Sequence, residues 1–139
     1  MSEHHPDFAP DIEVIDTPHG AYQMRSDILI HVRSAAGDHT AEQAQAWVDM
    51  VRDLRVKTGR KIRMLLDVRA TRNTEPQARE VYNSPENSGN IAGAAMVIDG
   101  GISRVIGNFA LRLTKLDAPT RLFNSVSEAI EWLESLDDE

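Results

Sequence analysis

Two short polar segments hold the side chains of this sequence that are best suited to chemistry. Each segment directly follows a run of apolar residues with the length of a buried strand. Ligands of sheets with parallel strands bind beyond the carboxyl ends of the strands, close to the first turns of helices. The two segments therefore predict one candidate binding pole, made of Asp67, Arg69, Thr74, Asp99, Ser103 and Arg104.

Three interpretations of this pole can be weighed. Asp67 and Asp99 could act as a carboxylate pair in acid–base catalysis, but the sequence shows no substrate-facing partner for them. The backbone amides from Ser103 onward could bind an anion, and the glycine pair before them would let backbone come close to a ligand. The structural interpretation, which we favour, is that the hydroxyl residues cap helices, the aspartates end strands and the arginines pair with acids.

Other catalytic and metal chemistry finds no support in the sequence. There is no cysteine, so disulfides and thiolate chemistry are excluded. His19, His31 and His39 fall in different expected elements, without the close spacing of metal ligands. The Gly-x-Ser-x-Gly elbow of one class of serine hydrolases is missing. We predict no catalytic residue, no metal site and no cofactor.

The distribution of charge narrows the range of partners. The 139 residues suffice for one domain with a real core, and their net charge is −7. Nine of the 15 basic residues fall within residues 52–79, whereas residues 128–139 hold acids and no base. The acidic segments would repel phosphate, so a general nucleic-acid binder is not expected. The basic segment is either a solvated face, which we favour, or a local surface for an anion or a partner.

The N-terminal residues and the lengths of the apolar runs indicate where in the cell the protein is expected. No apolar run approaches the roughly 20 residues that a membrane-spanning helix needs. The N-terminus lacks the basic start and apolar stretch of a secretory signal, so we expect a cytoplasmic protein. Prolines, histidines and acids in residues 1–11 predict a disordered arm ahead of a single domain at residues 12–139.

The first half of the domain is expected to pass from strands to a helix and back to a strand. Thr40 and Gln43 have the spacing of a capping box, and they open a helix whose apolar positions recur up to Gly59. Residues 61–67 are too few for a helix and predict a strand buried on both faces, reached by a crossover and so parallel to its neighbour. An antiparallel meander of alternating residues is predicted before the helix, at residues 12–16, 21–24 and 28–32.

The second half continues the same alternation of strands and helices. Thr74 is the expected cap of a helix with Glu75 and Pro76 in its first turn. The elements that should follow are a polar loop at 83–90, a buried strand at 94–98, a helix from Ser103, an edge strand at 121–123 and a last helix capped by Asn124 or Ser125. The pattern predicts one α/β domain with a mixed sheet of about five or six strands and about four helices.

Four large apolar side chains fall on the inner faces of the expected elements: Trp47, Met96, Phe109 and Trp132. The simplest interpretation is that they are core residues at helix–sheet contacts. They could instead line a ligand cavity or a dimer face, because aromatic and methionine side chains suit adaptable apolar surfaces.

The order of these elements resembles the STAS fold of anti-sigma-factor antagonists, in particular the small bacterial SpoIIAA-like group also labelled STAS/SEC14. The resemblance covers residues 12–136. It is carried by Met-Leu-Leu-Asp-Val-Arg at 64–69, by residues 94–108, by Thr-Arg-Leu-Phe-Asn-Ser at 120–125 and by Glu-Ala-Ile-Glu-Trp-Leu at 128–133.

The resemblance implies a non-enzymatic interaction or regulatory domain with a protein partner, and we expect it to form a homodimer. It also implies a second candidate, a carrier of a small apolar or lipid ligand, which predicts a closed apolar cavity under residues 69–90. Antagonists of this family are switched by phosphorylation of a serine in an Asp-Ser-Ser-Gly-like motif. That motif is absent here, since its place falls near Thr74-Glu75-Pro76. An enzyme acting through Asp67 and Asp99 is the third and weakest candidate.

Overall fold

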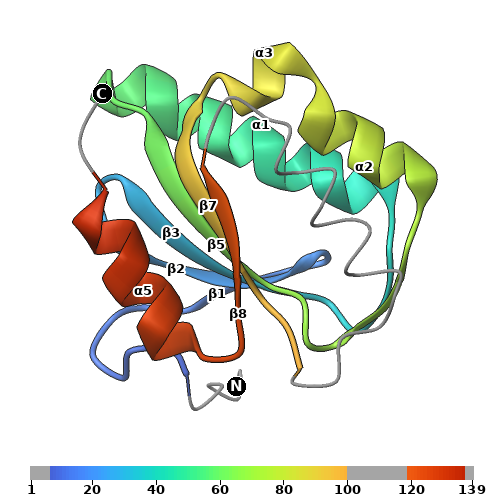
Figure 1. Ribbon diagram of the computed structural model, residues 1–139, viewed down its shortest axis with the longest axis horizontal. Helices are drawn as coiled ribbons and strands as arrows, with labels where there is room; N and C mark the ends of the chain where they lie inside the picture. Colours follow the sequence, from blue (N-terminus) through green and yellow to red (C-terminus); the bar gives the residue numbers. More distant parts are fainter. Residues whose placement is uncertain (1–6, 100–118, 137–139) are drawn as a thin grey trace.

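A mixed sheet of six strands runs through the middle of the protein (Figure 1). The structure is a computed structural model that describes residues 7–99 and 119–136. The strand order is β1-β2-β3-β5-β7-β8; β1 to β3 form an antiparallel meander, and β3, β5, β7 and β8 are parallel. The predicted mixed sheet is confirmed, with strands β1 (Ile15–Thr17), β2 (Gly20–Ser26), β3 (Leu29–Ser34), β5 (Ile62–Asp67), β7 (Ile91–Val97) and β8 (Thr120–Phe123).

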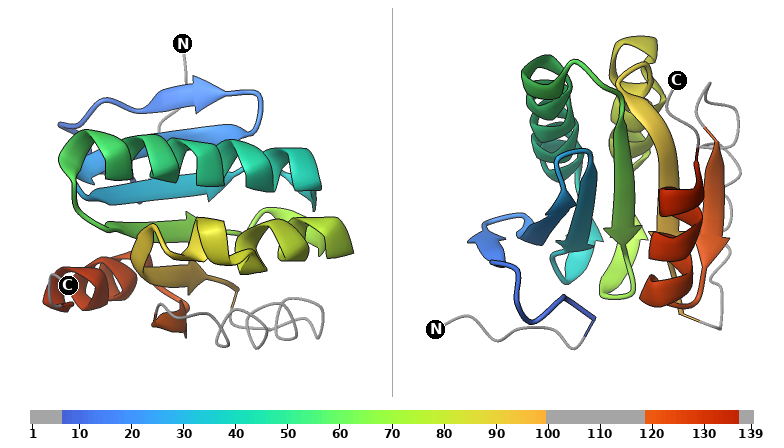
Figure 2. Two further views of the ribbon diagram at one scale, coloured as in Figure 1. Left: turned by 90° about the horizontal axis from the view of Figure 1, so that it is seen from above. Right: turned by 90° about the vertical axis from the view of Figure 1, so that its left-hand side faces the viewer.

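Helices cover the two faces of the sheet unequally (Figures 1 and 2). The first face, called the α1 face, carries α1 (Ala41–Thr58), α2 (Pro76–Asn83) and the single turn α3 (Pro85–Ser88). The opposite face, called the α5 face, carries α5 (Val126–Ser135), which contacts β5, β7 and β8. Each face has its own apolar core, and the core of the α1 face is the larger. No helix in the described residues is long and apolar enough to cross a membrane.

The central strand β5 supplies side chains to both cores, as its sequence predicts. Met64 and Leu66 pack in the core of the α1 face, whereas Leu65, on the other side of the strand, packs against α5. All three side chains are buried. A strand of this kind lies in the middle of a sheet with helices above and below, because period-two alternation sends successive side chains to opposite layers.

The long helix α1 begins and ends where the sequence indicates. Thr40 Oγ1 accepts a hydrogen bond of 3.2 Å from Gln43 N, and Gln43 Oε1 accepts one of 3.1 Å from Thr40 N. This reciprocal capping box satisfies two amides that the helix itself leaves unpaired. The helix ends at Thr58, and its C-cap Gly59 has a left-handed φ of 70°.

A second, two-stranded parallel sheet joins the loops that lead into α1 and α2. Its strands are β4 (Gly37–His39) and β6 (Thr71–Thr74), and neither is among the strands that the sequence predicts. Thr74 is therefore the end of a strand, and the prediction that it caps α2 is wrong. The N-cap is Glu75, with Pro76 in the first turn, and the Glu75 carboxylate accepts a 3.1 Å hydrogen bond from Ala41 N at the start of α1.

The N-terminal segment (residues 7–12) packs on the part of the α5 face that α5 leaves uncovered. Phe8 is 5% exposed and lies against His31 of β3, with 4.5 Å between the ring centroids. Gln23 of β2 accepts from Ala9 N at 2.8 Å and donates to the carbonyls of Ala9 and Ile12. Residues 7–11, which lie within the arm that the sequence predicts to be disordered, are held on the sheet by the Phe8 ring and by the hydrogen bonds of the Gln23 amide. Strand β1 begins at Ile15, whereas the predicted strand begins at residue 12.

The C-terminal part follows the sequence expectation closely. Strand β8 is an edge strand, and Ser125 caps α5 by accepting a 3.3 Å hydrogen bond from Glu128 N. Val126, Ala129, Ile130 and Leu133 form the buried side of α5. The expected helix from Ser103 falls outside the described residues, together with Ser103, Arg104 and Phe109.

Candidate functional site

The carboxylate of Asp67, the last residue of β5, is the centre of a cluster of charged side chains. It has no exposed surface. Arg69 Nε donates to Oδ1 at 3.0 Å and Arg69 Nη2 donates to Oδ2 at 2.7 Å, while the Arg69 backbone amide donates to Oδ1 at 3.1 Å. Arg33 Nη1, from the end of β3, donates to Oδ2 at 3.3 Å. Both oxygens of the buried charge are therefore satisfied.

These contacts fix the ionisation of the pair. Burial acts to raise the pKa of Asp67, but the hydrogen bonds from the Arg69 side chain and backbone and the charges of Arg69 and Arg33 outweigh it. The net result is a pKa below the ordinary 3.8. The hydrogen bond from Arg69 to the Asp67 carboxylate, together with the hydrogen bond to Asp7, raises the pKa of Arg69 above its usual range. The cluster stays charged at neutral pH, and so it holds structure rather than exchanging protons.

The other predicted members of the pole do not join this cluster. Thr74 lies at the end of β6, where its carbonyl accepts from Arg79 at 3.4 Å. Asp99 is exposed and lies two residues beyond Val97, the β7 partner of Asp67. No contact between the two aspartates occurs in the described part of the chain. The structure brings Asp67 and Arg69 together, and leaves Thr74 and Asp99 apart from them.

Three charged residues near Asp67 were missed from the sequence. Arg33 is the register partner of Asp67 in the parallel pair β3–β5, so opposite charges at the ends of adjacent strands could have indicated it. Asp7 accepts from Arg69 Nη2, which also donates to Asp67, across 62 positions of the sequence, and Arg25 Nη2 donates to the Asp7 carbonyl at 3.3 Å. No sequence signal points to Asp7 or Arg25, because both depend on how the N-terminal segment folds back.

A pocket of about 520 Å³ opens beside this cluster, between the N-terminal segment and the start of α5. We call it the arginine pocket. Its charged lining residues are Asp7, Arg25 and Arg69, and the remaining lining residues are Asn124, Ser125, Val126, Ser127 and Ile130. It lies on the α5 face, at the carboxyl ends of the parallel strands, where ligands of such sheets bind.

A second polar group, Ser34, His39 and Tyr82, is buried on the route from β3 to α2. Ser34 Oγ lies 2.9 Å from His39 Nδ1, and the Tyr82 hydroxyl lies 2.6 Å from His39 Nε2. Burial lowers the pKa of His39 from 6.5 to about 4 and raises the pKa of Tyr82 above its usual range. The neutral imidazole is held between two hydroxyls, each less than a tenth exposed as a residue, so this trio has no access for a substrate.

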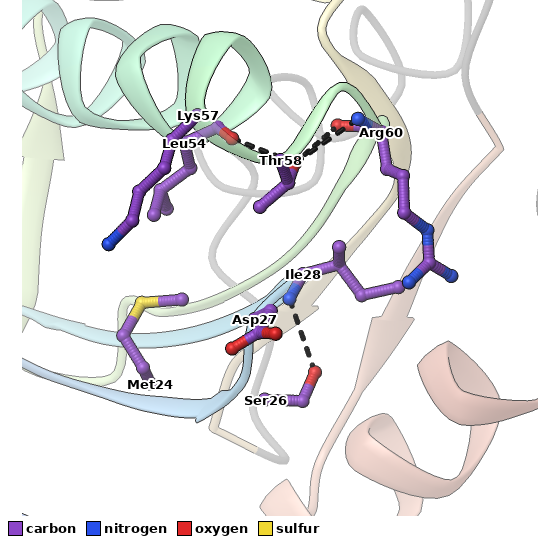
Figure 3. A pocket seen from close by; sticks show the side chains of 8 residues that line it. All are labelled: Met24, Ser26, Asp27, Ile28, Leu54, Lys57, Thr58 and Arg60. Carbon is purple, nitrogen blue, oxygen red and sulfur yellow. Dashed lines mark hydrogen bonds between the residues drawn. The ribbon is translucent and has the colours of Figure 1, made fainter.

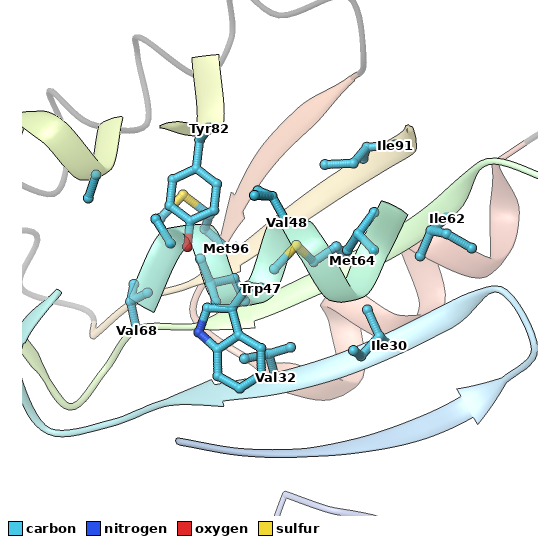
Figure 4. Packing of buried hydrophobic residues seen from close by; sticks show 14 of the residues in the cluster. Ile30, Val32, Trp47, Val48, Ile62, Met64, Val68, Tyr82, Ile91 and Met96 are labelled. Atoms are coloured by element: carbon cyan, nitrogen blue, oxygen red, sulfur yellow. The ribbon is translucent and has the colours of Figure 1, made fainter. Parts of the chain in front are cut away.

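Three of the predicted apolar residues fall within the described part of the chain. Trp47 and Met96 are 1% exposed and pack with Tyr82 and Val68 in the core of the α1 face (Figure 4). Trp132, in contrast, lies on α5 and is only partly buried. Trp47 and Met96 are therefore core residues, whereas Trp132 retains exposed surface.

A second pocket, of about 450 Å³, lies at the opposite end of the parallel strands (Figure 3). Leu54, Lys57 and Thr58 from the end of α1 face residues of the turn between β2 and β3 across it. Its charged side chains do not converge, since no ion pair joins Asp27 and Lys57 among the interactions of the described residues. The pocket shows no arrangement of groups that would select a ligand.

The outer side of α5 and the edge strand β8 combine acidic and aromatic surface. Glu128, Glu131 and Glu134 are all exposed along α5. Arg121 of β8 lies over two rings, with its Cζ 5.4 Å from the centroid of Phe123 and 5.7 Å from that of Trp132. The two rings are 5.7 Å apart and tilted. We call these six residues the α5–β8 surface.

Comparisons with known proteins identify the fold. A family model described as "Domain of unknown function (DUF7793)" matches residues 22–137. The crystal structure of an uncharacterised DUF3478-family protein with a SpoIIAA-like fold, from Shewanella loihica PV-4, matches with a TM-score of 0.52 and 15% identity over 96% of this chain and 98% of that chain. No curated protein matches.

A second solved structure is a candidate anti-sigma factor antagonist from Thermotoga maritima. It matches with a TM-score of 0.53 and 15% identity over 83% of this chain and 94% of that chain. At this identity the two likenesses establish the fold alone. The predicted SpoIIAA-like, STAS-type fold is confirmed.

Proposed function

The chain belongs to the family of domains of unknown function DUF7793, and we propose that it is a non-enzymatic interaction domain that binds a protein partner through the α5–β8 surface. The fold likeness to a candidate anti-sigma factor antagonist supports a role of this class. The partner is expected to present basic side chains.

The observation that carries the proposal is the row of glutamates on α5. Glu128, Glu131 and Glu134 are exposed at every third position, and none forms an ion pair within residues 7–99 and 119–136. Three uncompensated like charges on ten helical residues repel one another, and a basic partner surface would relieve that repulsion. Charge complementarity of this kind favours fast association and selects the partner.

The aromatic residues beside this row supply an apolar centre for the contact. Trp132 and Phe123 are partly exposed, and Arg121 stacks across both rings. Tryptophan, aromatic residues and arginine are enriched at the energetic centres of protein interfaces. A surface with two rings and a stacked guanidinium bordered by acids therefore has the composition of a docking site.

The geometry of the pole argues against catalysis by Asp67. A general acid or base works best with a pKa near the operating pH, which for a carboxyl requires an upward shift. The pKa of Asp67 moves the other way, and its oxygens are fully used by Arg33 and Arg69. Asp99 does not approach it, so the carboxylate pair considered from the sequence has no geometric support in the described residues.

The carrier of an apolar ligand is likewise less favoured. It requires a closed apolar cavity under residues 69–90, and that space holds packed side chains instead. Ala78 and Tyr82 of α2 are buried against Trp47, Val68 and Met96 in one core cluster. Serine phosphorylation at the start of α2 is not part of the proposal, because Glu75 and Pro76 stand there.

The proposal includes a homodimer in the cytoplasm. The dimer would form through a face other than the α5–β8 surface, since two acidic rows facing each other would repel. Native mass spectrometry of the purified chain tests this, and a bare monomer would contradict it. An added mass lost on activation would instead revive the carrier interpretation.

The docking proposal is tested by charge reversal. We expect Glu131→Lys/Glu134→Lys to lose the partners that the wild-type chain captures from its native cells, as quantified by mass spectrometry. A purified partner should then bind the wild type with an association rate that falls as salt is raised. Trp132→Ala should accelerate dissociation of the same complex.

The matched control is Asp53→Lys/Glu80→Lys, which changes the net charge equally but on exposed positions of α1 and α2. This control should retain the partner. Equal loss from both double variants would show a general charge effect and would contradict the docking site. Retention of the partner by the α5 variant would contradict it as well.

A further inference from the structure

We propose that the arginine pocket binds a small oxyanion, a carboxylate or phosphate group of a ligand, in competition with the protein's own Asp7. This inference does not rest on the α5–β8 surface. The pocket lies where the N-terminal segment meets the first turn of α5, on the face that both cover.

The charges around the pocket favour an anion. Three arginines and two aspartates lie in or beside the pocket, so one positive charge is not neutralised. They are Arg25, Arg33, Arg69, Asp7 and Asp67. Arg33 contacts Asp67, and Arg69 contacts both aspartates. Within the described residues Arg25 has no carboxylate partner; its Nη2 donates to the Asp7 backbone carbonyl, and its Nε is buried without a hydrogen-bond partner. An oxyanion that binds the Arg25 guanidinium would give this cation a charged hydrogen-bond partner.

The neutral lining adds donors without adding negative charge. Ser125, Ser127 and Asn124 carry hydroxyl and amide groups at the pocket wall. The wall also includes the first residues of α5, a helix whose N-terminal amides and dipole attract anions. Ser125 Oγ already serves the Glu128 amide, which leaves the amides of Val126 and Ser127 for a ligand.

The pocket already binds a carboxylate, that of Asp7. The Asp7 side chain reaches Arg69 from 62 positions away and accepts from Nη2, the same guanidinium nitrogen that also donates to Asp67. Arg25 holds the backbone of the same residue. An oxyanion from solution would find the guanidinium groups prearranged, and it would have to displace or share the Asp7 contact.

The volume of about 520 Å³ sets the class of ligand. It exceeds the space of a simple ion and falls within the range of small-molecule sites. The pocket therefore has room for a ligand larger than its acidic group, and inorganic phosphate and acetate serve as probes of the two acidic groups.

The test is a titration of the full chain with phosphate or acetate in chloride buffer, followed by the amide NMR signals of Val126 and Ser127 and the Nε–H signal of Arg25. We expect saturable shifts in the wild type. Arg25→Gln should weaken the affinity roughly tenfold, the effect of removing one charged hydrogen bond. Asp7→Asn should strengthen it, because the internal competitor loses its charge.

The matched control is Arg52→Gln, since Arg52 is an exposed arginine of α1 remote from the pocket. Its affinity should equal that of the wild type. Absence of saturable shifts in the wild type, an unchanged affinity in Arg25→Gln, or no gain in Asp7→Asn would each overturn the proposal. A larger response to phosphate than to acetate would assign a phosphate group, and the reverse would assign a carboxylate.

Discussion

Arg69 holds the carboxylate of Asp67 with two side-chain hydrogen bonds, of 3.0 Å from Nε and 2.7 Å from Nη2, although only Val68 separates the two residues. The chain turns sharply after β5 to allow this, and the Arg69 amide donates to the same carboxylate. The buried charge at the end of the central strand is thus neutralised from within its own loop, with Arg33 added from the neighbouring strand.

Asp67→Asn should destabilise the protein by about 3 kcal/mol, because it leaves Arg33 and Arg69 facing a neutral amide in a buried site. Urea unfolding at pH 7 measures the loss. The control Asp53→Asn removes an aspartate whose side chain is 78% exposed, and it should change stability by less than about 0.5 kcal/mol. Equal losses of stability in the two variants would contradict the stabilising role of the Asp67 cluster.

The lowered pKa of Asp67 also predicts an acid dependence. Below the ordinary 3.8 the unfolded chain protonates this carboxyl before the folded chain does. Its stabilising contribution is therefore complete above about pH 4 and is lost as the pH falls further, toward the lowered pKa. Asp67→Asn should show a smaller loss of stability than the wild type over that acid range.

His39 predicts a separate pH dependence at milder acidity. Its pKa is 6.5 in the unfolded chain and about 4 in the folded protein, so the unfolded chain binds more protons between these values. Stability should fall by about 3 kcal/mol from pH 7 to pH 4 through this group. Unfolding curves across this range should be less pH-dependent in His39→Gln, and parallel curves would contradict the buried neutral imidazole.

Tyr82→Phe should cost about 1 to 2 kcal/mol, because it removes the hydroxyl 2.6 Å from His39 Nε2 and leaves a buried nitrogen unpaired. Tyr22→Phe is the matched control. Tyr22 packs edge-on against Trp47 and is only partly buried. Its substitution should cost less than about 0.5 kcal/mol in the same urea assay.

Phe8→Ala tests the docking of the N-terminal segment. The ring is 5% exposed and lies against His31, so its removal should cost about 2 kcal/mol and speed hydrogen exchange at the Ala9 amide, which donates to Gln23. Ile15→Ala, at a side chain in β1 that is 37% exposed, should cost less. A neutral Phe8→Ala would show that the segment is a loose arm after all.

Two glycines with positive φ should differ in their tolerance of alanine. Gly20 has φ 132°, and an added Cβ would lie 2.3 Å from the carbonyl oxygen of Arg33, so Gly20→Ala should cost about 3 kcal/mol or more. Gly37 has φ 98° and open space around it, so Gly37→Ala should carry only the conformational cost of about 1 to 2 kcal/mol. Thermal unfolding of both variants measures the difference.

The sequence predicts those parts of the fold in which local pattern and tertiary packing agree. Residue type and spacing predict three such features: the capping box at Thr40, the burial of β5 on both faces and the inner side of α5. The predicted strand and helix order, and with it the SpoIIAA-like fold, follows from these elements.

What the sequence misses depends on contacts between distant segments. Strands β4 and β6 are too short and polar to show a period, and each forms only because the other lies beside it. Asp7 and Arg25 reach the Asp67 cluster only after the N-terminal segment has folded back. Arg33 could have been found, since its register opposite Asp67 follows from pairing two predicted strands.

The small β4–β6 sheet ties the starts of α1 and α2 together. The Glu75 amide donates to the His39 carbonyl at 3.0 Å, and the Glu75 carboxylate accepts a hydrogen bond from the Ala41 amide. The His39 side chain contacts Tyr82 within α2. Each strand-to-helix connection is thus fastened to the other as well as to its own helix. The two helices are expected to move over the sheet as one rigid plate, so a displacement imposed on either reaches the carboxyl ends of both β3 and β5 at once.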